Sequence, residues 1–116
     1  MKTLATIDEL DAAVAGSSTR PAVFFKHSPV CGTSAMANEA IGDLPDDGPH
    51  VDADWYLVPV QASRAVSNAL SKRFGIRHES PQVLVVNDQH VVWHGSHFRV
   101  TPTAIQSALD ALKSRA

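Results

Sequence analysis

Hydrophobic and polar positions along the chain follow two periods in turn. Short apolar runs of strand type are followed by segments in which apolar residues recur at helical spacing. The runs predicted as strands are 22–26, 55–60, 81–86 and 91–94. The segments predicted as helices begin near residues 7, 34, 64 and 102. The predicted order is helix, strand, helix, strand, helix, strand, strand, helix, which is typical of a mixed sheet with helices on both faces.

The ends of the predicted helices are marked by capping residues. Thr6 and Glu9 form a capping box, since the Thr6 hydroxyl can accept from the third helical amide while Glu9 reaches back to the cap amide. Ser63 is a candidate cap for the third helix, and Gly75 closes that helix. Thr101 is the expected cap of the last helix, which has a proline at its first position.

The strand sequences predict how the sheet is built. Four consecutive apolar residues at 22–25 are typical of a central strand covered on both faces, as in a parallel α/β sheet. Residues 87–90 have turn chemistry between two β-rich runs, so the run at 91–94 is expected to return antiparallel. We therefore expect a single α/β domain over residues 1–116, with a mixed four-stranded sheet flanked by helices on both faces.

Composition and charge exclude several classes of protein. The net charge of -2 argues against a nucleic-acid partner, because phosphate binding needs concentrated Lys and Arg. No apolar run is long enough to span a membrane, and the first residues lack the apolar region of a signal peptide. A single cysteine with no export signal indicates a reducing, cytoplasmic environment.

The only cysteine, Cys31, lies between a predicted buried strand and the predicted start of a helix. The unpaired amides of a first helical turn and the positive end of the helix dipole stabilise a thiolate there. Such surroundings lower the pKa of a cysteine below its free value of ~8.5 and make it nucleophilic. The alternative is an inert buried thiol. Because Cys31 is flanked by Pro29 and Gly32 in a loop rather than on an apolar face, we interpret it as catalytic.

The residues after Cys31 predict one-thiol chemistry. Thr33 and Ser34 can offer hydroxyl or amide hydrogens to the thiolate, or they can simply cap the helix. Ser34 stands where a C-x-x-C motif would have its second cysteine. Because a serine cannot attack a mixed disulfide, exchange is expected to stop at Cys31–S–S–R until an external thiol resolves it. Gly32, between the thiol and these hydroxyls, is a further candidate for positioning the substrate.

Two other segments supply candidate site residues. Lys26 and His27 precede Cys31 by five and four positions, and either can add positive charge near the thiolate or hold an anionic group of a small thiol. The alternative for each is a polar residue at a surface or strand end. Ser80 and Pro81 precede a predicted strand. A proline at a strand start is ordinary, whereas a cis proline is a specific feature of a fold.

The six histidines do not predict a metal site. His94 and His97 are three positions apart, and His78 and His90 are near in sequence, but the only thiol is far from them in the chain. Neither a C-x-x-C nor an H-E-x-x-H motif occurs. Histidines at the surface or at strand ends are the simpler interpretation, and no metal site is expected.

Several motifs together resemble a known family. F-K-H-S at 25–28 is followed by Cys31 and Ser34, and the later segments are V-Q-A-S-R-A-V-S-N at 60–68, H-E-S-P-Q-V at 78–83 and V-W-H-G-S-H at 92–97. This combination resembles the YtxJ family of the bacillithiol redox system, the monothiol bacilliredoxins. The resemblance covers nearly the whole chain. It differs at Gly32, where the family commonly has a proline after the cysteine.

The resemblance implies a thioredoxin-like fold, which the predicted element order and cysteine position also favour. It implies that Cys31 attacks a protein–bacillithiol mixed disulfide and that Pro81 is a cis proline beside the thiol. The implied partners are bacillithiolated client proteins and the small thiol itself, with bacillithiol as co-substrate and no tightly bound cofactor.

Two alternatives remain open from the residues. Cys31-Gly32-Thr33-Ser34 is similar to the C-G-F-S loop of monothiol glutaredoxins, which carry an iron–sulfur cluster between two subunits. However, Thr33 replaces the aromatic residue, and the Gly-Gly turn that those proteins use for glutathione is absent. The other alternative is a non-catalytic thioredoxin-like interaction module.

Overall fold

The computed structural model describes residues 2–28 and 53–113 of the chain. The predicted helix at 34–41 and the predicted site residues Cys31, Gly32, Thr33 and Ser34 lie outside the described residues.

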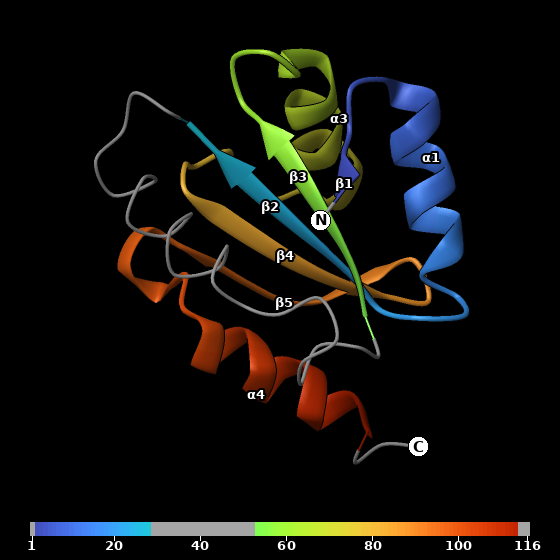
Figure 1. Cartoon of the computed structure of the whole chain (residues 1–116), viewed down its shortest axis with the longest axis vertical. Helices are drawn as coiled ribbons and strands as arrows, with labels where there is room; N and C mark the ends of the chain where they lie inside the picture. Colours follow the sequence, from blue (N-terminus) through green and yellow to red (C-terminus); the bar gives the residue numbers. More distant parts are fainter. Residues whose placement is uncertain (1, 29–52, 114–116) are drawn as a thin grey trace.

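A five-stranded mixed sheet with the strand order β1-β3-β2-β4-β5 forms the centre of the described structure (Figure 1). Its strands are β1 (Lys2–Thr3), β2 (Ala22–His27), β3 (Asp54–Pro59), β4 (Gln82–Asn87) and β5 (His90–Ser96). β1 and β2 run parallel to β3, whereas β4 runs antiparallel to both β2 and β5. The predicted central position of the 22–26 strand and the antiparallel return of the last strand are confirmed.

The prediction of four strands was wrong by one. β1 contains two residues, which pair with Tyr56 and Leu57 of β3 at the edge of the sheet. Both β1 residues are exposed. A two-residue strand with no buried side chain is too short to show an alternating pattern, so the sequence contains no signal for it.

Helices cover both faces of the sheet. The helices are α1 (Ile7–Gly16), α3 (Arg64–Phe74) and α4 (Pro102–Lys113), with a short 3₁₀ helix η1 (His97–Arg99) before the last. Figure 1 shows α1 and α3 on one side of the sheet and α4 on the other. The two apolar clusters agree with this arrangement, because one contains Leu10 and Leu70 and the other contains Ile105 and Leu109.

The alternation of side chains along β2 divides it between the two cores. Phe24 is fully buried on the α1 and α3 side, where its ring stacks on Tyr56 with centroids 5.4 Å apart. Val23 and Phe25 are fully buried on the α4 side. The continuous apolar run at 22–25 therefore reflects burial on both faces of one strand.

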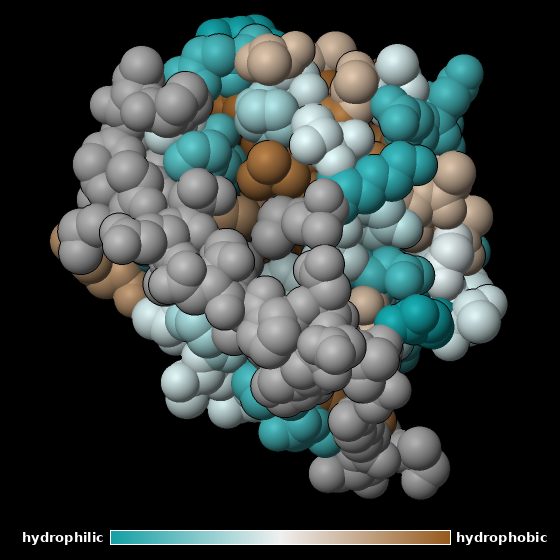
Figure 2. Space-filling model, in the orientation of Figure 1, coloured by the Kyte–Doolittle hydropathy of each residue, from teal (hydrophilic) through white to brown (hydrophobic). Residues whose placement is uncertain are grey.

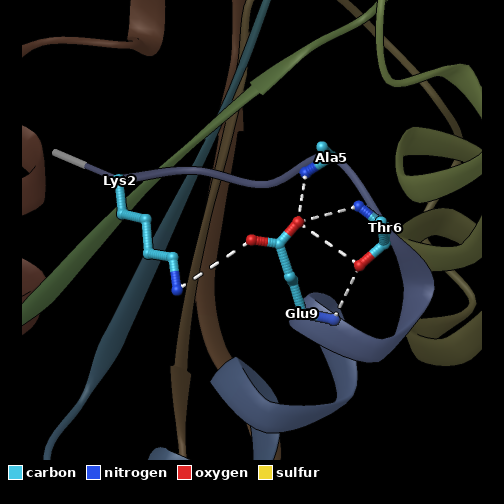
Figure 3. A network of polar contacts seen from close by, with 4 residues as sticks. All are labelled: Lys2, Ala5, Thr6 and Glu9. Atoms are coloured by element: carbon cyan, nitrogen blue, oxygen red, sulfur yellow. Dashed lines mark hydrogen bonds and ion pairs between the residues drawn. The ribbon is translucent and has the colours of Figure 1, made fainter.

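The capping box at the start of α1 is present as predicted (Figure 3). The amide of Glu9 donates to Thr6 Oγ1 at 3.1 Å, and Glu9 Oε1 accepts from the amides of Ala5 and Thr6 at 3.0 and 3.1 Å. Lys2 Nζ lies 4.0 Å from Glu9 Oε2. These contacts satisfy amides that a helix start leaves without helical partners.

The other predicted helix ends are confirmed with one exception. Gly75 closes α3 with φ of 65°, a left-handed conformation that glycine adopts without steric cost. Thr101 Oγ1 accepts from the amide of Ala104 at 3.2 Å. Ser63 occupies the cap position of α3, but its side chain makes no capping hydrogen bond.

The turn between β4 and β5 has the geometry of a two-residue hairpin. Asp88 and Gln89 have φ values of 50° and 66°, as a type I′ turn requires. The turn is also tied to the end of α1, because the amides of Asp88 and Gln89 donate to the carbonyl and hydroxyl of Ser17 at 2.8 and 2.9 Å. The hairpin is thus held in place by a residue far away in the sequence, since Ser17 precedes Gln89 by 72 positions.

Gly95, near the end of β5, is buried against an aromatic ring. A Cβ atom at this position would lie 2.7 and 2.9 Å from two ring atoms of Trp93 and 3.4 Å from Arg99 Cβ. Contacts below 3.0 Å require a shift of the ring, so the indole occupies the space that a side chain at position 95 would need.

The surface of the described part mixes residue types. On the face shown in Figure 2, hydrophilic and hydrophobic residues are interspersed. The large apolar side chains that are exposed in the described part are Ile7, Val92 and Phe98, and Phe98 is 79% exposed. Among the described residues, no helix is long and apolar enough to cross a membrane.

We expect Thr6→Ala to lower the free energy of unfolding by about 1 kcal/mol, because it removes the hydroxyl that accepts from the Glu9 amide. Urea denaturation followed by far-ultraviolet circular dichroism measures this change. Thr19→Ala, at an exposed threonine in the turn after α1, is the matched control and should change stability by less than half as much. Equal effects of the two substitutions would contradict the capping role.

Candidate functional site

The described part of the candidate site lies where β2 ends and β4 begins. Because the two strands are antiparallel, Lys26 of β2 is the register partner of Gln82 of β4. The Ser80–Pro81 bond directly before β4 is cis. The chain leaves β2 at this end of the sheet through His27 and Ser28 toward Cys31, three residues beyond Ser28 in the sequence.

The side chain of Lys26 is fully buried. It points to the α1 and α3 side of the sheet, where Nζ donates to Ser71 Oγ of α3 at 2.7 Å and lies 3.2 Å from His78 Nδ1. Ser67 Oγ is 3.4 Å from the same His78 nitrogen. Lys26 is therefore not a surface residue, and its amine cannot reach a ligand on the surface without leaving these partners.

Burial changes the protonation of this cluster. It lowers the pKa of Lys26 from 10.5 to about 8, because the ammonium loses hydration that neutral partners replace only in part. The pKa of His78 is also lowered, first by burial and then by the positive charges of Lys26 and Arg64, while Glu79 acts in the opposite direction. A neutral His78 with Nδ1 as acceptor is the form that complements a charged Lys26.

His27 lies on the opposite face of the sheet from Lys26. Its ring centroid is 5.8 Å from that of Phe25, on the α4 side. The Nδ1 atom of His27 is buried and has no hydrogen-bond partner among the described residues. Although Lys26 and His27 are adjacent in sequence, the strand separates their side chains, so they cannot act together on one face.

Two residues that follow β3 hold the end of β2 in place. Gln61 Nε2 donates to Ser28 Oγ at 2.8 Å, and the Val60 amide donates to the carbonyl of His27 at 2.9 Å. Ser28 is buried. The segment after β3 therefore fixes the point at which the chain departs toward Cys31.

Ser80 and Pro81 lie at this end of the sheet, directly before β4. Ser80 is half-buried and Pro81 is buried. The carbonyl of Pro81 accepts from the amide of His97 at 2.9 Å, which ties the end of β5 to the start of β4. His97 has φ of 55°, so the chain turns sharply there.

The histidines of the described part do not form a metal-binding group. Among residues 2–28 and 53–113, no group of three or more His, Cys, Asp and Glu side chains is placed to hold a metal ion.

Sequence reasoning did not assign Ser71, Ser67, Gln61 or Gln82 to the site. Ser67, Gln61, Gln82 and His78 were named only within family motifs, and His78 was also considered as a metal ligand. A hydrophobic pattern gives no signal for polar residues that face a buried lysine from another element. The informative feature was Lys26 itself, since a lysine that directly follows four buried apolar residues in a central strand needs buried polar partners.

Known proteins similar to this chain agree with the geometry. Residues 2–105 match the family described as monothiol bacilliredoxin BrxC. A solved structure of a proposed oxidoreductase with a thioredoxin fold superposes with a TM-score of 0.80 at 25% identity, covering 92% of this chain and 91% of the other.

Thioredoxins superpose at lower identity. Thioredoxin of Fasciola hepatica gives a TM-score of 0.75 at 15% identity over 96% of this chain and 98% of its own. Mitochondrial thioredoxin 3 of Saccharomyces cerevisiae gives 0.74 at 13% identity over 96% and 94%. The fold is therefore thioredoxin-like, as predicted.

We expect stability to depend on pH through Lys26. Between pH 8 and 10.5 the unfolded chain holds a proton that the folded chain has released, so the free energy of unfolding rises with pH in this window. Relative to Lys26→Met, the wild type should gain on the order of 2–3 kcal/mol from pH 7.5 to 10.5. Urea denaturation of both proteins at both pH values measures the gain. Subtracting the change seen in Lys26→Met from that of the wild type removes the contributions of the other titratable groups.

Lys72→Met, at an exposed lysine of α3, is the matched control and should follow the wild type at both pH values. A constant difference between wild type and Lys26→Met would show that Lys26 is not desolvated in the folded chain.

Proposed function

Because this chain belongs to the monothiol bacilliredoxin family, we propose that it removes bacillithiol from protein mixed disulfides through Cys31. A thiol redox function is common to this family and to the oxidoreductase fold of the chain. The observation that carries the proposal is the placement of a buried lysine, beside the strand start that Pro81 precedes, at the end of the strand that leads to the only cysteine. We further propose that the protein acts in the cytoplasm with no tightly bound cofactor and takes bacillithiol as its co-substrate.

The proposed reaction is a pair of thiol exchanges. The thiolate of Cys31 attacks the bacillithiol sulfur of the mixed disulfide, the client sulfur leaves with the bonding electron pair, and that thiolate takes a proton from water. Cys31 now carries bacillithiol in a disulfide. A second bacillithiol thiolate attacks the carried sulfur, which releases Cys31 and forms bacillithiol disulfide. Because Ser34 cannot supply the second thiol, the external molecule is required.

Lys26 contributes to this reaction through charge. Its ammonium is buried near the end of β2, on the side of the sheet that α1 and α3 cover. There it forms hydrogen-bond contacts with the neutral groups Ser71 and His78. A positive charge without a described carboxylate partner raises the local potential and favours an anion nearby. We assign Lys26 the role of a positioning residue whose charge stabilises the thiolate from the α1 and α3 side of the sheet. Thr33, Ser34 and Gly32 are proposed to act on the thiolate or the substrate from the loop itself, and Ser80 and Pro81 to position the disulfide.

The test of the reaction is the intact mass of the reduced protein after incubation with bacillithiol disulfide or with glutathione disulfide. We expect a rapid gain of one bacillithiol, slower uptake of glutathione, and no adduct on Cys31→Ser. Equal uptake of the two thiols, or a preference for glutathione, would contradict the bacillithiol assignment and direct attention to iron–sulfur reconstitution. No adduct with either would contradict a thiol redox role for Cys31.

The role of Lys26 is tested by the alkylation of Cys31 with iodoacetamide across the pH range. Lys26→Met should slow alkylation about threefold at pH 7, because the thiolate loses a nearby positive charge, and the difference should close at alkaline pH. Ser71→Ala, which removes a hydrogen-bond partner but keeps the ammonium, is the matched comparison and should have the smaller effect. A uniform slowing at every pH would indicate a structural role instead.

A further inference from the structure

A basic hollow lies near Pro81, toward the edge of the sheet that β5 forms and away from β2. Its volume is about 380 Å³, within the range of small-molecule sites. The polar residues that line it come from the segment before β4, from the first residue of β4, from β5 and from η1. They include Arg77, Glu79, Gln82, His94, His97 and Arg99.

The charges of the hollow favour an anionic ligand. Two guanidinium groups, Arg77 and Arg99, and one carboxylate, Glu79, line the hollow together with two histidines. The pKa of Glu79 is lowered, first by a hydrogen bond from Ser96 and then by the charges of His97, Arg77 and His94, while partial burial opposes the change. Glu79 is thus ionised at neutral pH and balances only part of the positive charge.

The floor of the hollow offers an unused acceptor. Gln82 is 1% exposed, and its Nε2 donates to the carbonyl of Arg77 at 3.0 Å. Its Oε1 atom is buried and has no hydrogen-bond partner among the described residues. A ligand with hydroxyl or amide hydrogens as well as a negative charge would complement both features of the hollow.

The register of the sheet gives the distance between the hollow and the end of β2, where the chain continues toward Cys31. Lys26, Gln82 and Ser96 are successive partners across β2, β4 and β5, so they form one row perpendicular to the strands. Two strand spacings place Ser96 about 10 Å from the end of β2. The hydrogen bond from the His97 amide to the Pro81 carbonyl holds the hollow against the cis proline.

From this arrangement we infer that the hollow binds the carboxylate-bearing end of the small thiol whose sulfur is exchanged. This inference rests on the proposed function and names its specificity site. The matching ligand is a thiol with carboxylates at one end, hydroxyls in the middle and sulfur at the other end. Its carboxylates would meet the cations of the hollow and its hydroxyls would meet the Gln82 acceptor. Its length would then bring the sulfur to the end of β2. Arg77 and Arg99 are then specificity residues, and Glu79 limits the affinity for a dianion by repulsion.

Kinetics with two disulfides test the inference. The rates of Cys31 adduct formation with bacillithiol disulfide, which bears carboxylates, and with neutral 2-hydroxyethyl disulfide are measured for each variant. The ratio of the anionic to the neutral rate should fall about threefold in Arg77→Gln or Arg99→Gln and about tenfold in the double variant. The same ratio should rise about threefold in Glu79→Gln. Lys72→Gln removes an exposed cation of α3 outside the hollow and should leave the ratio within about 1.5-fold of the wild type.

Opposite changes of this ratio in the arginine and glutamate variants support the inference. If the arginine variants slow only exchange with capped client proteins, whatever small thiol caps them, the hollow recognises acidic client segments and the inference is overturned. A ratio that no variant changes also overturns it.

A binding measurement separates this inference from the proposed function. S-methyl bacillithiol, which cannot exchange, is titrated into Cys31→Ser while the imidazole signals of His94 and His97 are followed by nuclear magnetic resonance. Saturable shifts that weaken about threefold in Arg99→Gln support the hollow even if thiol exchange fails. Absence of binding, together with normal exchange in the wild type, overturns the hollow and leaves the proposed function intact.

Discussion

The central strand β2 determines how the rest of the described structure is arranged. It pairs parallel with β3 and antiparallel with β4, and its apolar residues are buried on both faces. A strand in this position must satisfy its backbone through both neighbours and supply side chains to two separate cores. β3 and β4 therefore lie directly beside β2, β1 and β5 extend the sheet beyond them, and the helices cover its two faces. The end of such a central strand is a common place for a loop with chemical function.

Lys26 places a buried amine in this mainly apolar strand. An ammonium costs free energy when it leaves water, and here Ser71 and His78 offset part of that cost from a different element. The apolar residues of β2 stabilise the fold, whereas the buried ammonium of Lys26 lowers the free energy of unfolding. The same charge raises the electrostatic potential at the end of the strand. Such local conflict between stability and electrostatics is typical of functional sites.

Most of the fold was predictable because its signals are local. Thr6 and Glu9, Gly75, and Thr101 mark helix ends through contacts within a few residues, and the apolar run at 22–25 identifies the central strand. β1 was missed because its two residues depend on pairing with β3 rather than on their own pattern. Ser63 was predicted as a side-chain cap from its residue type, but its hydroxyl makes no capping bond.

The candidate site was predictable only as individual residues. Lys26, His27, Ser80 and Pro81 were identified from their sequence positions, and the structure brings them to one end of the sheet. That Lys26 and His27 face opposite sides follows from strand geometry. The contact of Lys26 with Ser71 joins residues 45 positions apart, so it depends on how α3 packs and not on any local pattern. The positions of Cys31, Gly32, Thr33 and Ser34 remain predictions.

The packing of Trp93 over Gly95 has a consequence for how Gly95 is interpreted. The indole fills the space that a Cβ atom at position 95 would need, so a side chain there would force the ring to shift, and the glycine serves this packing rather than a special backbone conformation. A smaller residue at position 93 would remove that contact and permit a side chain at position 95. Gly95 is thus linked to the packing of Trp93, and its place within the V-W-H-G-S-H motif is explained by space for a ring rather than by chemistry.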